Sequence, residues 1–173
     1  EALISNKSYF FFSHTIKKQP YNRKLLQAIL NNNITLYDHE TLVNESNHRL
    51  IGFGYYAGVV GAYNGLRALG LKLNSFELPK ANDLNDRAAL NTQLDQLTVP
   101  NVKIVLTGTG RVGHGAKEIL DHLNIKQVSV DQFLNISFTE AVYVQLDVLD
   151  YCERLDGSTL EKTDFFKFPE AYQ

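Results

Sequence analysis

A glycine-rich turn between an apolar run and a helical pattern constrains this chain more than any other feature. Four glycines fall within the eight residues 108–115 of the stretch LTGTGRVGHGA. Glycine in the interior of a helix or strand costs about 0.5–1 kcal/mol relative to alanine, so four of them need a compensating reason. We interpret them as places where another group approaches the backbone more closely than a Cβ would allow.

The elements around this turn follow the order of a dinucleotide-binding unit. The apolar run VKIVL predicts a buried strand, Gly108-x-Gly110-x-x-Gly113 follows it, and AKEILDHL predicts a helix. The first glycine permits the tight turn, the second lets a pyrophosphate approach the backbone, and the third lets helix and strand pack closely. The backbone N–H groups at Arg111 and Val112, where the helix begins, would then face the phosphates.

An acidic residue completes the pattern. KQVSV predicts a second strand that ends at Asp131, 23 positions after Gly108. A carboxylate there would bond the adenosine ribose hydroxyls and repel a 2′-phosphate, which favours NAD over NADP. Arg111 weakly favours NADP, so NADP is not excluded. The alternatives are a glycine turn without a ligand and an Asp131 that lies in a solvated turn.

Polar side chains also follow the predicted strands of the first segment. YFFFSH predicts a strand that ends near His14 and Lys17, while ITLYD, closed by Glu40, and HRLIGF predict two more. Ligands of α/β folds bind at the carboxyl ends of parallel strands. A histidine titrates near neutrality and can move a proton, and Lys17 and Arg49 could hold carboxylates. From spacing alone, a structural strand-end histidine among solvated charges is the simpler interpretation.

A second glycine-rich segment separates these two regions. Its glycines recur at intervals of four, three and four from Gly54 to Gly65, which predicts a helix with a glycine stripe; an irregular loop is the alternative. We interpret residues 54–71 as a helix that joins residues 1–53, part of a substrate domain, to residues 72–173, an incomplete dinucleotide-binding domain. The predicted fold class is α/β with parallel strands.

Composition argues against several classes of partner. The formal net charge is −2 and no segment is strongly basic, so we expect no nucleic acid as the main partner. The longest weakly polar run, residues 51–71, contains Asn64 and Arg67 and is not expected to span a membrane. A single cysteine, Cys152, allows no internal disulfide and favours a reducing, cytoplasmic compartment. We expect no metal site.

Four stretches together resemble saccharopine dehydrogenase, in its lysine-forming or lysine–ketoglutarate reductase branch, within the alanine dehydrogenase and transhydrogenase superfamily. They are YFFFSHTIKKQ, LYDHETLV, RLIGFGYYAGVVGAYNGLRALG and VLTGTGRVGHGAKEIL, with SHTIK and FGYYAG as the specific part. The resemblance implies two Rossmann-like domains with the active site between them. It also implies NAD(P)-dependent interconversion of saccharopine with lysine and 2-oxoglutarate.

The resemblance further assigns roles to residues. The family's acid–base histidine corresponds to His14, the lysine of its His-x-x-Lys motif to Lys17, and the glutamate after LYD to Glu40. Its substrate-near arginine corresponds to Arg49. The resemblance implies amino-acid and oxo-acid substrates and a longer protein, because the family's second acid–base lysine would precede the first residue and further strands would follow the last. The alternatives are a non-catalytic nucleotide-binding module and an alanine-type amino-acid dehydrogenase.

Overall fold

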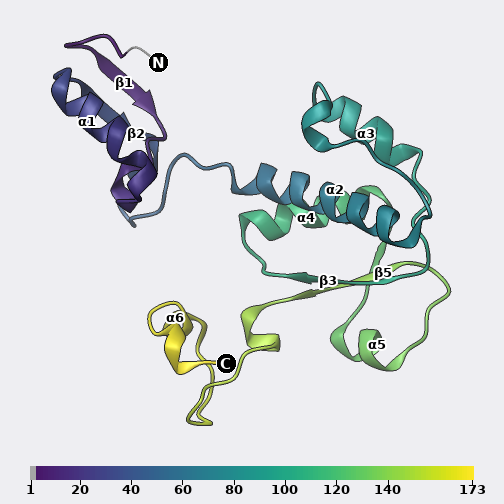
Figure 1. Cartoon of the computed structure of the whole chain (residues 1–173). Coiled ribbons are helices and arrows are strands. Elements are labelled where there is room, and N and C mark those ends of the chain that lie inside the picture. Colours follow the sequence, from purple (N-terminus) through teal and green to yellow (C-terminus); the bar gives the residue numbers. More distant parts are fainter. Residues whose placement is uncertain (1–2) are drawn as a thin grey trace. The chain divides into compact units, whose positions relative to one another are not determined.

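The chain contains two β-sheets, each made of parallel strands (Figure 1). The computed structural model describes residues 3–173, and the chain divides into two units, Glu1–Phe53 and Gly54–Gln173. All strand pairs within both sheets are parallel, which confirms the predicted α/β class. Among the described residues, no helix is long and apolar enough to cross a membrane.

The first unit is built on a two-stranded sheet. Phe11 at the end of β1 pairs with Asp38 at the end of β2, so the loops after both strands start at the same edge. The stretch HRLIGF, predicted as a third strand, forms only an isolated bridge between Arg49 and Val43. The elements are β1 (Ser8–Phe11), the 3-10 turns η1 (Thr15–Lys17) and η2 (Pro20–Asn22), α1 (Arg23–Asn31), β2 (Thr35–Asp38) and the 3-10 turn η3 (His39–Thr41).

The second unit contains a three-stranded parallel sheet in the order β3-β5-β4. The segment that the glycine intervals predicted as a helix is the helix α2, and it packs against α4, the helix that follows the glycine turn. The elements are α2 (Gly54–Leu73), η4 (Ala81–Asp83), α3 (Arg87–Asp95), β3 (Lys103–Thr107), α4 (Arg111–His122), β4 (Lys126–Gln127), α5 (Val130–Asn135), β5 (Val142–Leu146), η5 (Val148–Asp150), α6 (Lys162–Phe165) and η6 (Pro169–Ala171).

The strand β4 is shorter than the sequence predicted. It ends at Gln127, and the rest of the predicted strand turns into α5. The physical reason is a capping box: the Ser129 hydroxyl accepts from the backbone N–H of Gln132, and the Gln132 side chain accepts from the N–H of Ser129. Asp131 therefore lies in the first turn of a helix and not at the end of a strand.

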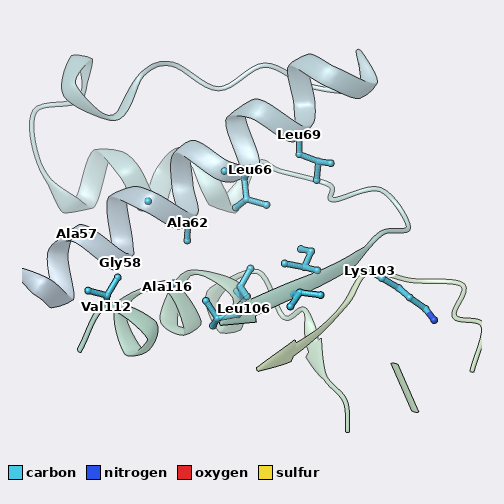
Figure 2. A pocket seen from close by; sticks show the side chains of 14 residues that line it. Ala57, Gly58, Ala62, Leu66, Leu69, Lys103, Leu106, Val112 and Ala116 are labelled. Atoms are coloured by element: carbon cyan, nitrogen blue, oxygen red, sulfur yellow. The ribbon is translucent and has the colours of Figure 1, made fainter. Parts of the chain in front are cut away.

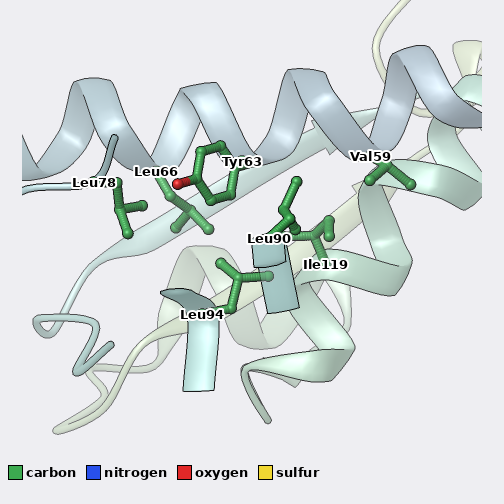
Figure 3. Packing of buried hydrophobic residues seen from close by; sticks show 7 residues of the cluster. All are labelled: Val59, Tyr63, Leu66, Leu78, Leu90, Leu94 and Ile119. Carbon is green, nitrogen blue, oxygen red and sulfur yellow. The ribbon is translucent and has the colours of Figure 1, made fainter. Parts of the chain in front are cut away.

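Two glycines let α2 and α4 approach closely. A Cβ on Gly58 would lie 2.8 Å from the backbone nitrogen of Ala116, and a Cβ on Gly115 would lie 3.0 Å from that of Val59. Each would also overlap a backbone carbonyl of the facing helix. Apolar residues of α2, α3 and α4 and of the loop after α2 pack into a core cluster, which Figure 3 shows: Val59, Tyr63, Leu66, Leu78, Leu90, Leu94 and Ile119.

The last two glycines of the stripe on α2, Gly61 and Gly65, have a different environment. No described atom lies within 4 Å of the place where a Cβ on Gly61 or Gly65 would stand. Both glycines line an apolar groove of about 480 Å³ between α2 and β3, with Ala62 and Leu106 among its walls (Figure 2). The glycine stripe thus has two parts, one in contact with α4 and one open.

Candidate functional site

A buried carboxylate in the first unit gathers three basic side chains. Glu40 lies in η3, directly after β2, and its side chain is only 2% exposed. Its Oε1 accepts a hydrogen bond from Arg49 Nη2 at 2.7 Å and lies 3.2 Å from Lys17 Nζ. Its Oε2 lies 3.1 Å from Nδ1 of His14. The structure therefore brings together all four residues that the sequence pointed to in this segment.

The charges in this cluster are not balanced. Burial raises the pKa of Glu40, but hydrogen bonds from Lys17, His14 and Arg49 outweigh it and hold that pKa below its usual range. One ionised carboxylate thus faces two permanent cations and an imidazole, all of them 46–48% exposed. The solvent side of the cluster is positive, as a site for substrate carboxylates requires.

The contact with Glu40 also determines which nitrogen of His14 can act as a base. An ionised carboxylate accepts hydrogen bonds only, so Nδ1 of His14 carries the proton that it donates to Glu40. In the neutral imidazole the lone pair is then on Nε2. His14 can accept a proton from a substrate at Nε2 while Glu40 stabilises the imidazolium that forms.

A second candidate site surrounds the glycine turn between β3 and α4. Gly108 has φ of 91°, a conformation that residues with a side chain disfavour. A Cβ on Gly113 would lie 2.9 Å from the carbonyl carbon of Gly108. The Gln145 side chain donates a hydrogen bond to that same carbonyl oxygen at 2.9 Å. Both glycines are therefore required by the turn itself.

The second fingerprint glycine marks an open space. Gly110 is the N-cap of α4, and no described atom lies within 4 Å of the position of its missing Cβ. Arg111 and Val112 form the exposed first turn, where backbone N–H groups have no partner within the helix. An anion can approach this backbone, so the turn fits the pyrophosphate of a dinucleotide.

Asp131 lies in α5, the helix that follows β4. In the sheet, β4 is separated from β3 by β5, so β4 lies about two strand spacings, roughly 10 Å, from β3. On α5, Asp131 accepts a hydrogen bond from Asn135 at 2.8 Å.

A different acid, Asp147, stands beside the glycine turn. It is the first residue after β5. The N–H of Gly108 donates to the carbonyl of Leu146 at 2.7 Å, so Asp147, the residue after Leu146, lies beside the turn. Thr109 within the turn donates to Asp147 Oδ2 at 2.7 Å, and Lys162 pairs with the same oxygen. Lys162 and Thr109 together lower the pKa of Asp147 to about 2.

The sequence contained a signal for Asp147 that the spacing rule did not use. VYVQL is an apolar run that ends in an acid, as expected for a strand with a functional carboxyl end. The rule that places the acid about 20 residues after the glycines assumes that the next strand in the chain is also the neighbour in the sheet. Here α5 and the displaced β4 intervene, so the neighbouring strand comes later.

Comparison with known proteins shows relatives over nearly the whole chain. The chain is 30% identical over 194 residues to the mitochondrial alpha-aminoadipic semialdehyde synthase of Rattus norvegicus, covering 99% of this chain and 21% of that protein. It is 30% identical over 208 residues to the alpha-aminoadipic semialdehyde synthase of Arabidopsis thaliana, covering 99% and 19%. No protein-family model matches the sequence.

A third relative carries the name that the sequence resemblance suggested. The chain is 28% identical over 130 residues to the NAD(+), L-lysine-forming saccharopine dehydrogenase of Candida glabrata, covering 69% of this chain and 35% of that enzyme. The resemblance to saccharopine dehydrogenase is thereby confirmed. The chain spans about a fifth of the length of the rat and Arabidopsis relatives.

Proposed function

We propose that this chain is part of an NAD(P)-dependent oxidoreductase that interconverts saccharopine with lysine and 2-oxoglutarate. The observation that carries the proposal is the buried Glu40, which orients His14 beside the two cations Lys17 and Arg49. The relatives named saccharopine dehydrogenase and alpha-aminoadipic semialdehyde synthase support it. The open glycine turn at Gly110 supports a dinucleotide cofactor.

The cluster can perform the proton transfers of this reaction. A nicotinamide, when bound, supplies the hydride acceptor for the carbon of the C–N bond. In the hydration that follows, Nε2 of His14 takes a proton from the attacking water and returns it to the departing amine nitrogen. Lys17 and Arg49 balance substrate carboxylates, and Glu40 stabilises the positive charge on His14 between the two transfers.

For the cofactor we propose NAD, held by backbone groups at Gly110, Arg111 and Val112. We propose Asp147 for the contact with the adenosine ribose, in place of Asp131, because Asp147 adjoins the glycine turn. A carboxylate there favours the 2′-hydroxyl of NAD over the 2′-phosphate of NADP. Lys162, already paired with Asp147, reduces this preference.

Steady-state assays of the intact protein test the proposal. Oxidation of NADH with lysine and 2-oxoglutarate, or its reverse with saccharopine, is the expected activity. Turnover of pyruvate and ammonia instead would indicate an alanine-type dehydrogenase. Nucleotide binding without turnover of any of these substrates would indicate a non-catalytic module and would overturn the proposal.

A pair of histidine variants tests the role of the cluster. We expect His14→Gln to lower kcat by about 10²–10⁴-fold, the range of general acid–base catalysis, and to remove a limb of the pH profile. The exposed His48 lies in the same unit outside the cluster, so His48→Gln is the matched control. Equal kcat and equal pH profiles in both variants would make His14 a structural residue.

The cellular location is a separate proposal. The single cysteine predicts a cytoplasmic protein, whereas the rat relative is named a mitochondrial enzyme. Fractionation of cells that express the intact protein distinguishes the two compartments.

A further inference from the structure

A second buried carboxylate lies behind the Glu40 cluster. Asp38 is the last residue of β2 and is 7% exposed, and Ser13, two residues beyond the end of β1, is 2% exposed. The mechanism above uses neither residue. A buried acid that faces no cation directly needs hydrogen-bond donors to stay charged, and the donors of Asp38 all come from the two loops that carry the site.

These hydrogen bonds join the loop after β1 to the loop after β2. Asp38 Oδ2 accepts from the hydroxyl of Ser13, and Oδ1 accepts from the backbone N–H of Glu40 at 2.9 Å and more weakly from that of Ser13 at 3.4 Å. The Ser13 hydroxyl oxygen in turn accepts from the backbone N–H of Thr15 at 3.1 Å. Asp38 is therefore tied to the residues on both sides of His14 and to Glu40 itself.

The backbone of His14 needs such support. Its φ of 55° and ψ of 11° place it in the left-handed region, which residues other than glycine visit infrequently. A residue persists there when its surroundings determine the conformation. Ser13 and Thr15, the immediate neighbours of His14, are the two residues that the hydroxyl of Ser13 connects.

The charge on Asp38 agrees with this arrangement. Burial raises its pKa, but the hydrogen bonds from Ser13 and from the backbone of Glu40 outweigh burial, so the pKa lies below its usual range. Asp38 is thus an ionised acceptor whose two oxygens together bind both loops.

We propose that Asp38 and Ser13 are positioning residues that set the contact between His14 and Glu40. This inference rests on the proposed function, since it assigns them a role in the reaction of that cluster. Neither residue touches substrate. They act by fixing the backbone on both sides of His14 and at Glu40, so that Nδ1 meets Oε2 and Nε2 stays free for the proton.

The test is Ser13→Ala in the intact enzyme, with Ser8→Ala as matched control on the exposed start of β1. We expect kcat to fall about 10–100-fold, the loss that follows when a catalytic group is displaced by an ångström or so. The KM for 2-oxoglutarate should change little, because Lys17 and Arg49 remain.

Asp38→Asn is the second variant and should produce the same fall in kcat with little change in the KM for 2-oxoglutarate. Thermal melts by circular dichroism accompany both variants. A lowered melting temperature with unchanged kcat would overturn the inference, and so would failure of both variants to fold while Ser8→Ala folds, because either result makes the network purely structural. Absence of turnover in the wild-type enzyme would instead overturn the proposed function.

Discussion

Replacing glycine by alanine should have opposite effects on stability in the two parts of the glycine stripe on α2. Gly58 is buried against α4, whereas Gly61, one turn further along the same helix, is exposed and faces the groove. Gly58→Ala overlaps its methyl group with the carbonyl oxygen of Val112 and places it 2.8 Å from the backbone nitrogen of Ala116. Both neighbours are backbone atoms of α4, which cannot rotate away as a side chain can, so the two helices must move apart before these distances reach the 3.4 Å at which ordinary contact begins.

The magnitudes follow from two terms. Inserting a methyl group into a close-packed contact typically costs about 1–3 kcal/mol, and a backbone neighbour favours the upper half of that range. Alanine in a helix gains about 0.8–1.0 kcal/mol over glycine. We therefore expect Gly58→Ala to lower the free energy of unfolding by roughly 1–2 kcal/mol, and Gly61→Ala to raise it by up to about 1 kcal/mol.

Urea unfolding of the purified chain, followed by helical circular dichroism, measures both changes. The midpoint should fall for Gly58→Ala and rise for Gly61→Ala, with similar slopes if both act on the native state. A Gly58→Ala protein that is as stable as Gly61→Ala would refute the close approach of α2 and α4 on which this reasoning depends.

Three further predictions concern the glycine turn and its acid. Gly110→Val should abolish binding of NADH and NADPH in calorimetry of the intact protein and leave its circular dichroism spectrum unchanged, because the side chain fills open space; unaltered affinity would place the nucleotide elsewhere. Asp147→Ser should reduce the preference for NADH over NADPH more than Asp131→Ser does, in paired fluorescence titrations, and the reverse order would restore Asp131 as the ribose acid. Because the pKa of Asp147 is about 2 in the folded chain against a reference of 3.8, its contribution to stability is present above about pH 4 and is lost as the pH falls towards 2. Urea midpoints at pH 5 and pH 2.5 should therefore differ less for Asp147→Asn than for the wild type, and equal differences would contradict the ion pair with Lys162.

The sequence predicted the local parts of both sites well. The strand, the glycine turn and the helix α4 depend on residues that are adjacent in the chain, so pattern and spacing were sufficient. The helix α2 was predicted from its glycine intervals for the same reason. Likewise, His14 and Glu40 follow strands that pair in sequence order, which brings them to one edge of the sheet.

What the sequence did not predict depends on the order of strands. Whether Asp131 or Asp147 stands beside Gly108 is decided by the insertion of β5 between β3 and β4, a non-local pairing that spacing along the chain does not encode. The capping box at Ser129 that ends the predicted strand was readable from Ser129 and Gln132, but the apolar run around them favoured a strand. The link from Asp38 to Ser13 likewise needs the register of β1 and β2.

The hydrogen bond from Gln145 to the carbonyl of Gly108 has a consequence for how the turn meets a ligand. Glycine has more backbone freedom to lose than any other residue. A flexible glycine turn would lose that conformational freedom when an anion bound. Here a side chain from the neighbouring strand already holds the turn in shape, so the entropic cost is met on folding and not on association. For the phosphate binding proposed above, we therefore expect the affinity of the turn to depend on Gln145, a side chain that the phosphate need not touch.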